Sequence, residues 1–311
     1  TNLAYEGESI YNYLQVKNLS DRTILSTNVL FGVQSVTMKD KGLTGMYYDT
    51  ALAAPALADN ADSALILGMG TGTYARQLKQ YYPKMNITGV EIDQKITDLA
   101  GEYFDEPADI PVTTYDGRAW LAASHDKYDV IMVDAYQDIT IPFQMSSTEF
   151  FTMVREHLNP GGVMVVNMNM ISDGQGSINE ALSDTIASVF GNGNTLTADV
   201  PNTTNRELFA KKPGSGSEEN SMQQASKALN LRETTYERTG SEDLEWYMEE
   251  VASRFRKVNE PDSASTILTD DKAPVEVLGM HAIDQIIADE AGPYRQILKD
   301  EGFGGLLRAV Q

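Results

Sequence analysis

The sequence predicts an α/β protein built on a doubly wound, mostly parallel Rossmann-like sheet, preceded by a small antiparallel β subdomain. From residue 64 onward, short apolar runs alternate with helical stretches, an order typical of parallel strands covered by helices on both faces. The first apolar run ends in a glycine-rich turn, Gly68-Met69-Gly70-Thr71-Gly72. Acidic residues stand at or just after the ends of the next three strands. These observations predict a ligand-binding α/β domain.

The strands and helices of the sheet follow from apolar runs, helical periodicity and turn residues. We expect strands over residues 64–67, 87–93, 112–115, 128–134 and 162–167. Between them we expect helices over 74–82, 118–123 and 149–157, and one that follows the second strand and ends at residue 104. A further helix is expected over 46–58, a polar helical region over 221–257 and a last helix over 275–288.

The chain divides into two expected domains. Residues 10–16, 23–26 and 35–38 are rich in β-formers and predict an N-terminal β-hairpin subdomain over residues 1–45. Residues 46–311 form the expected nucleotide-binding catalytic domain, with a mobile Gly/Ser-rich linker over 212–220. The first residues lack the pattern of a signal peptide, and the chain does not begin with Met. We therefore expect a processed chain or a piece of a longer one.

Composition narrows the class of site. The 311 residues include no cysteine, which excludes disulfides, thiolate metal sites and cysteine nucleophiles. Only three histidines occur, far apart in sequence, so we expect no metal site. The formal net charge of −21 disfavours binding to nucleic acid and favours small cationic ligands such as polyamines. The alternative explanation of this charge is that an acidic surface simply keeps the protein soluble, without a cationic ligand.

The glycine turn and the acidic residues predict the ligand. Glycines let the backbone pass close to a ligand at the start of a helix. Glu91, 19 residues after Gly72, ends the second strand, where a carboxylate can accept both hydroxyls of a ribose. Asp116-Gly117 follows the third strand, near the expected adenine, and Asp134 ends the fourth.

The spacing of the glycines separates two ligand classes. A pyrophosphate-binding turn usually reads Gly-x-Gly-x-x-Gly, whereas this turn reads Gly68-x-Gly70-x-Gly72. S-adenosyl nucleotides carry no phosphate and suit the looser pattern. We therefore expect an S-adenosyl-nucleotide site on a sheet of the S-adenosylmethionine-dependent methyltransferase type.

At these motifs the sequence resembles the spermidine synthase (polyamine aminopropyltransferase) family, over roughly residues 6–290. The likeness rests on 48–57, 68–73, 90–93, 115–118 and 128–136. It is closest to spermidine-synthase-like domains fused to membrane-embedded segments, which show similar patterns at 8–13, 141–143 and 269–276.

The resemblance implies roles for individual residues. Cofactor-binding positions would be Gln34, Gly68, Gly70, Thr71, Gly72, Glu91, Asp116 and Gly117. Asp134 and Tyr48 would be catalytic, with Asp134 receiving the reacting amine. Asp49, Tyr136, Gln137 and Asp138 would bind the substrate. The co-substrate would be S-adenosylmethionine or its decarboxylated form, with no tightly bound cofactor.

Departures from the family pattern leave the reaction open. Thr71 replaces an aspartate that holds the ammonium of the decarboxylated donor, and Asp49-Thr50 and Ala135-Tyr136-Gln137 also differ from the family. Three functions therefore remain. The first is transfer of an aminopropyl group to a putrescine-like amine. The second uses intact S-adenosylmethionine for methyl transfer or another sulfonium cleavage. The third is a non-enzymatic sensor of nucleotide or polyamine in a membrane protein.

The resemblance also implies partners and a location. We expect a homodimer that takes a small cationic amine, binds no nucleic acid, and works in the cytoplasm or at the cytoplasmic face of a membrane. An attached membrane-embedded segment outside this sequence is compatible with the likeness.

Overall fold

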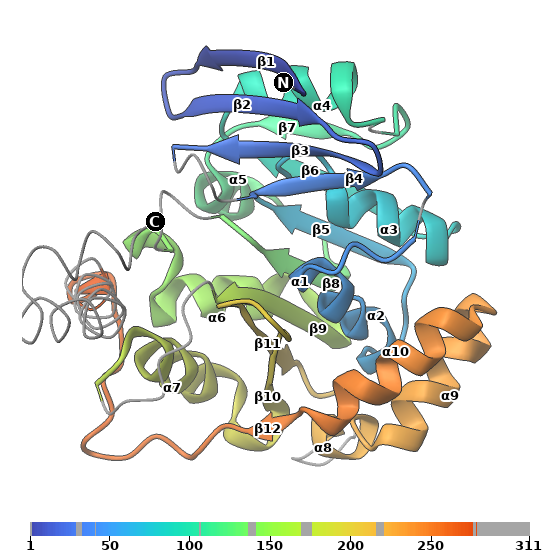
Figure 1. The fold of residues 1–311 in the computed structure, drawn as a ribbon. Coiled ribbons are helices and arrows are strands. Elements are labelled where there is room, and N and C mark those ends of the chain that lie inside the picture. Colours follow the sequence, from blue (N-terminus) through green and yellow to red (C-terminus); the bar gives the residue numbers. More distant parts are fainter. Residues whose placement is uncertain are drawn as a thin grey trace, which may run out of the picture.

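The computed structural model describes residues 2–275 apart from residues 29–32, 41, 106, 136–140, 169–175 and 216–220, and also residue 278. The described residues form a four-stranded and an eight-stranded sheet with flanking helices (Figure 1). Most of the expected last helix, 275–288, and most of the expected linker at 212–220 lie outside the described residues.

The small sheet is antiparallel and lies at one end of the molecule, drawn in blue in Figure 1. Its strands are β1 (Leu3–Glu8), β2 (Tyr13–Asn18), β3 (Arg22–Thr27) and β4 (Ser35–Met38), paired in chain order. Leu14, Val16 and Leu25 point to one face and pack against Leu99 and Phe104, in and just after helix α4 (Gln94–Tyr103). The predicted antiparallel subdomain is confirmed, but the expected strand over 10–16 begins too early, because residues 9–12 turn between β1 and β2.

The large sheet contains the five predicted parallel strands. These are β5 (Ser63–Leu67), β6 (Asn86–Glu91), β7 (Val112–Thr114), β8 (Tyr128–Val133) and β9 (Leu158–Met168), in the spatial order β9-β8-β5-β6-β7. The chain winds outward from β5 in both directions, which confirms the doubly wound prediction. In such sheets ligands bind outside the carboxyl ends of the strands, where the winding direction changes.

Three antiparallel strands extend the sheet beyond β9, and the sequence analysis missed them. They are β11 (Arg206–Lys211), which pairs with β9, then β10 (Thr195–Asp199) and β12 (Arg256–Lys257). The short strand β1 and helix α7 (Ile178–Phe190) were missed as well. β11 brings charged residues into the buried sheet, a composition that does not predict a strand.

Helices cover both faces of the large sheet. One apolar cluster joins it to α1 (Tyr47–Ala51), α2 (Ala53–Leu57), α3 (Thr73–Tyr81), α8 (Ser221–Ala225), α9 (Ala228–Thr239) and α10 (Glu242–Ser253). A second cluster, on the other face, joins it to α5 (Gly117–Ala123), α6 (Thr148–His157) and α7. Short 3₁₀ helices occur at η1 (Phe143–Met145) and η2 (Asn192–Asn194).

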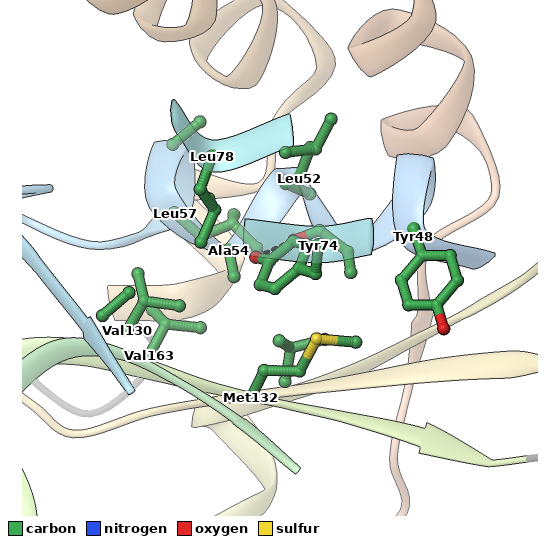
Figure 2. Close-up of a cluster of buried hydrophobic side chains, with 14 of the residues drawn as sticks. Tyr48, Leu52, Ala54, Leu57, Tyr74, Leu78, Val130, Met132 and Val163 are labelled. Carbon is green, nitrogen blue, oxygen red and sulfur yellow. Dashed lines mark hydrogen bonds between the residues drawn. The ribbon is translucent and has the colours of Figure 1, made fainter. Parts of the chain in front are cut away.

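The helix expected over 46–58 is broken into α1 and α2 at Leu52. Pro55 has no N–H group with which to bond the carbonyl of Ala51, four residues earlier. The hydroxyl of Tyr74 donates a 2.9 Å hydrogen bond to that carbonyl instead. Figure 2 shows Tyr74 between the broken helix and Met132 of β8. The break fixes the direction of α1, which carries Tyr47 and Tyr48 to the edge of the sheet.

Candidate active site

A cavity of about 170 Å³ opens at the carboxyl ends of the parallel strands and is lined by both sheets. The small sheet and its turns contribute Tyr11, Asn12, Leu25, Thr27, Gln34 and Ser35. The large domain contributes, among others, Tyr47, Tyr48, Gly68, Gly70, Glu91, Asp116, Gly117 and Asp134. Eight of the fourteen residues predicted for the site therefore line one cavity, which lies where the doubly wound topology favours ligand binding.

The glycine turn after β5 forms the floor of this cavity. Gly68 and Gly70 line it, and both adopt positive φ angles of 87° and 57°. A Cβ atom on Gly68 would lie 2.3 Å from the carbonyl oxygen of Asp134. Only glycine fits this contact in this conformation. The turn therefore lets the strands that carry Glu91 and Asp134 converge on the same space.

Glu91 ends β6, and its side chain is fixed by two backbone groups. Its Oε2 atom accepts a 2.8 Å bond from Gly70 N–H, and its Oε1 atom accepts a 3.0 Å bond from Asp93 N–H. Burial raises the pKa of the Glu91 carboxyl, while these two bonds lower it. Each carboxylate oxygen retains a further lone pair for a ligand hydroxyl.

Asp116 has two roles, because it caps helix α5 and also forms part of the cavity wall. Its Oδ1 atom accepts a 2.8 Å bond from Ala119 N–H at the start of α5. Asp116 and Gly117 both line the cavity on the side of β6 and β7. The capping bond orients the carboxylate and uses one oxygen, so the other remains for a ligand.

Asp134, directly after β8, is the central carboxylate of the site. Its Oδ2 atom accepts a 2.7 Å bond from the Tyr47 hydroxyl, and its Oδ1 atom accepts a 2.9 Å bond from Asn167 Nδ2. Asn205 in turn donates a 2.9 Å bond to Asn167 Oδ1, which fixes the orientation of the amide. Burial raises the pKa of Asp134 to about 7, although the bonds from Tyr47 and Asn167 oppose the shift.

The tyrosine beside Asp134 is Tyr47 and not Tyr48. The Tyr48 hydroxyl donates a 2.7 Å bond to the backbone carbonyl of Gln34, which joins α1 to the segment before β4. Both rings line the cavity, with their centroids 4.0 Å apart. Of the two tyrosines, it is therefore Tyr47 whose hydroxyl is bonded to Asp134, while Tyr48 shares the cavity wall with it.

Three predicted site residues lie outside this cavity. The carboxylate of Asp49 is buried and accepts bonds from Thr44, Gly45 and Gln77, so it stabilises the turn before α1. Gly72 has a left-handed conformation and begins α3. Thr71 is fully buried, and its Oγ1 atom has no hydrogen-bond partner among the described residues. Asp49, which was expected to bind the substrate, does not reach the cavity because local donors use its carboxylate. Tyr136, Gln137 and Asp138 lie outside the described residues.

Sequence reasoning missed a further buried carboxylate, Glu207 of β11. Glu207 pairs in register with Asn167 of β9, and it is fully buried. Neither of its carboxylate oxygens has a hydrogen-bond partner in the described part of the chain. Burial, with the charge of Asp134, raises the pKa of Glu207 well above its ordinary value.

Comparison with known proteins identifies the family. The family model of the spermine/spermidine synthase domain matches residues 47–212, more than half of the chain. The chain belongs to the spermine/spermidine synthase family. The matched region contains Glu91, Asp116 and Asp134 together with the tyrosines of α1, whereas the small sheet precedes it.

Individual members of the spermine/spermidine synthase family match parts of the chain. The polyamine aminopropyltransferase of Corynebacterium efficiens is 37% identical over 131 residues, which cover 38% of this chain and 25% of that protein. That of Vibrio vulnificus is 28% identical over 199 residues, which cover 61% of this chain and 65% of that protein. The chain thus spans less than two thirds of the length of these relatives.

Solved structures of the spermine/spermidine synthase family share the fold. A probable spermidine synthase from Corynebacterium glutamicum gives a TM-score of 0.60 at 22% identity, covering 86% of this chain and 99% of that one. A spermidine synthase in complex with the transition-state analogue AdoDATO gives 0.57 at 19% identity, covering 69% of this chain and 75% of that one. The likeness confirms the Rossmann-like prediction. None of the helices in the described ranges has the length and apolar character needed to cross a bilayer.

Proposed function

We propose that this protein transfers an aminopropyl group from decarboxylated S-adenosylmethionine to a small amine. The observation that carries the proposal is the convergence of Glu91 and Asp134 on one cavity, on the two strands that flank β5. The relatives from Corynebacterium efficiens and Vibrio vulnificus are polyamine aminopropyltransferases, which supports the same reaction.

The nucleoside half of the donor has four candidate ligands in the cavity wall. Glu91 has two oriented oxygens for the ribose hydroxyls, because backbone N–H groups already fix its carboxylate. Asp116 and Gly117 suit the adenine edge, and Gln34 lines the opposite wall. The glycine turn leaves room for the nucleoside beside the backbone.

The transfer itself needs no covalent enzyme intermediate. The lone pair of the amine nitrogen attacks the methylene carbon next to the sulfonium, so a C–N bond forms as the C–S bond breaks. The bonding pair moves to sulfur and leaves a neutral thioether nucleoside. The new ammonium then releases one proton. The protein has to hold nitrogen, carbon and sulfur in line and accept that proton.

Asp134 suits the role of proton acceptor. Its pKa near 7 matches a base that works at neutral pH, where ionised and protonated forms are both populated. Tyr47 and Asn167 each donate to one of its oxygens and so stabilise the ionised form. Tyr48 lines the same cavity and suits packing against the donor or the acceptor.

Use of intact S-adenosylmethionine is the second candidate function, and Thr71 favours it. The family's aspartate at this position would repel the carboxylate of the intact donor, whereas Thr71 adds no charge. The Thr71 side chain is fully buried and does not line the cavity, so it places no charge against the carboxylate of an intact donor.

Single-turnover assays with each donor, in the presence of a diamine, test the proposal. We expect production of 5′-methylthioadenosine from the decarboxylated donor together with an aminopropylated amine. Formation of S-adenosylhomocysteine from the intact donor would instead support methyl transfer. Binding of a nucleoside without turnover of either donor would support a sensing domain. Homodimer formation, cytoplasmic location and attachment to a membrane segment remain predictions.

A further inference from the structure

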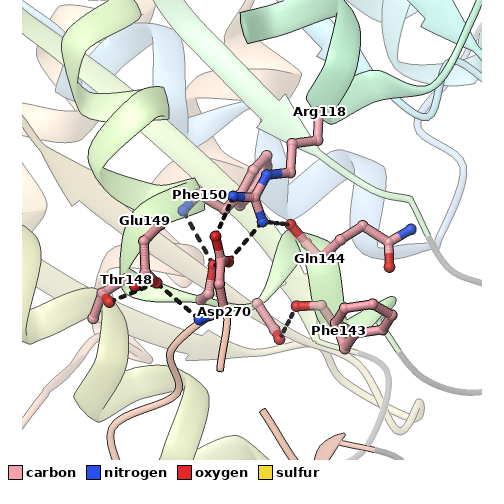
Figure 3. A network of polar contacts seen from close by, with 9 residues as sticks. Arg118, Phe143, Gln144, Thr148, Glu149, Phe150 and Asp270 are labelled. Carbon is pink, nitrogen blue, oxygen red and sulfur yellow. Dashed lines mark hydrogen bonds and ion pairs between the residues drawn. The ribbon is translucent and has the colours of Figure 1, made fainter. Parts of the chain in front are cut away.

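A charged pair outside the cavity joins three segments that are distant in sequence. The guanidinium of Arg118, in the first turn of α5, donates to both carboxylate oxygens of Asp270 at 2.8 and 2.6 Å. The same guanidinium donates a 2.8 Å bond to the backbone carbonyl of Gln144 in η1. Figure 3 shows Arg118 with Asp270 and Gln144 at its two sides. We call this group of three residues the Arg118 clamp.

The turn that carries Asp270 is itself attached to the start of α6. Asp270 Oδ1 accepts a 2.5 Å bond from the Ser147 hydroxyl, and Asp270 N–H donates a 3.0 Å bond to Glu149 Oε2. The backbone of Thr148 bonds Leu268 at 2.9 Å. Residues 268–270 are therefore bound to the helix that follows the cavity wall, and among the described residues of this segment none lines the cavity.

Two of the segments held by the Arg118 clamp are walls of the cavity. Pro142, Gln144 and Met145 line it on one side of Arg118, and Asp116 and Gly117 line it directly before Arg118 in the chain. The Arg118 guanidinium thus sets the distance between the wall at η1 and the start of α5. Asp270 supplies the charge that orients this guanidinium, because a bidentate pair fixes the plane of the arginine.

The exposure of the Arg118–Asp270 ion pair indicates that it positions the cavity wall and adds little to the stability of the fold. The side chains of Arg118 and Asp270 are 22% and 39% exposed. Ion pairs with this exposure contribute little to stability, since water and salt screen them. Loss of the pair should therefore leave the fold intact while it changes the position of Gln144 relative to Asp116.

We propose that Asp270 and Arg118 are positioning residues for the nucleoside end of the donor site. The inference rests on the proposed function, because it assigns the adenine to the wall formed by Asp116, Gly117 and η1. Neither residue touches the reacting atoms. Their effect is on the affinity for the nucleoside and not on the chemical step.

Three variants test the proposal: Asp270→Asn, Arg118→Gln and the double variant. Calorimetry with 5′-methylthioadenosine measures nucleoside affinity, and steady-state kinetics with the decarboxylated donor measure KM and kcat. We expect each single variant to weaken nucleoside binding roughly threefold to tenfold. The donor KM should rise by the same factor, whereas kcat and the KM of the amine should not change. The double variant should bind no more weakly than the single ones, because the residues act as one unit. Asp271→Asn, at the exposed neighbouring position, is the matched control and should behave as wild type.

Three results would overturn the inference. The first is wild-type nucleoside affinity in both single variants. The second is a fall in Tm together with a parallel loss of kcat and of affinity for both substrates, which would indicate a structural role only. A wild-type protein that binds no nucleoside is the third, and it would overturn the proposed function at the same time.

Discussion

The Tyr47 hydroxyl donates a 2.7 Å hydrogen bond to Oδ2 of Asp134, across 87 residues of sequence. The bond joins α1 to the end of β8 and stabilises the ionised form of a carboxylate whose burial favours the protonated form. Tyr48, one residue later, bonds the backbone of Gln34 instead. Two adjacent tyrosines therefore perform separate tasks, and their removal should have different consequences.

Tyr47→Phe should move the acidic limb of the kcat/KM profile to higher pH. The change removes a donor that lowers the pKa of Asp134, so the pKa rises further above 7 and less of the base is ionised at neutral pH. Tyr48→Phe keeps that donor and should move the limb less. A profile measured from pH 5 to 9 compares the two variants. An unmoved limb in Tyr47→Phe would show that Asp134 does not titrate in this profile.

Asp134→Asn should abolish most of the turnover and leave nucleoside binding intact. The amide cannot accept the proton from the attacking amine, and a general base typically contributes about a hundredfold to ten-thousandfold to the rate. Single-turnover rates and calorimetry measure the two properties separately. Wild-type turnover at neutral pH would remove Asp134 from the mechanism.

Glu91→Gln should weaken nucleoside binding by about 1–3 kcal/mol, since charged acceptors make stronger bonds to hydroxyl groups than amides do. The amide can accept from only one of the two backbone N–H groups that Glu91 now satisfies. Thermal unfolding should therefore accompany calorimetry, so that binding is compared between folded proteins. An unchanged affinity in a folded variant would contradict the ribose assignment.

Glu207→Gln should reduce the dependence of stability on pH. The native state keeps a proton on Glu207 above pH 4.5, whereas the unfolded chain releases it, so stability falls as pH rises. Asp134 acts in the same direction up to about pH 7. Between pH 5 and 7 the wild type should lose stability more steeply than the variant, by at most about 1.4 kcal/mol per pH unit for the one proton that Glu207 retains.

Urea unfolding across this pH range measures the slope. The exposed Glu233 of α9 offers a control, and Glu233→Gln should keep the slope of the wild type. Equal slopes in wild type and Glu207→Gln would mean that Glu207 is already ionised in the folded protein.

The sequence was sufficient to predict the residues whose positions depend on strand order. Parallel strands end at the same edge of a sheet, so Gly68, Glu91, Asp116 and Asp134 had to converge once the strands were located. The residues that hold Asp134 were beyond prediction. Whether Tyr47 or Tyr48 reaches it depends on the direction of α1, which the Pro55 break and the Tyr74 bond determine.

Charged residues in buried strands were the other source of error. β11 contains Arg206, Glu207 and Lys211, and such a composition is typical of an exposed segment. The pairing of β11 with β9 buries all three. Asp49 led to an error of another kind. Its place in a family motif suggested that it binds the substrate, whereas local backbone and side-chain donors use its carboxylate oxygens.

Asp93 makes the small sheet responsive to whatever binds Glu91. Its N–H group bonds Glu91 Oε1, while its own Oδ2 atom accepts bonds from Ser9 at 2.5 Å and Asn12 at 3.1 Å in the turn between β1 and β2. A ligand that fixes Glu91 would also restrain this turn, so local opening of the first hairpin would become rarer. Amide hydrogen exchange at residues 9–12 would then slow when the cavity is filled, and the hairpin would report occupancy of a site that lies mainly in the other domain.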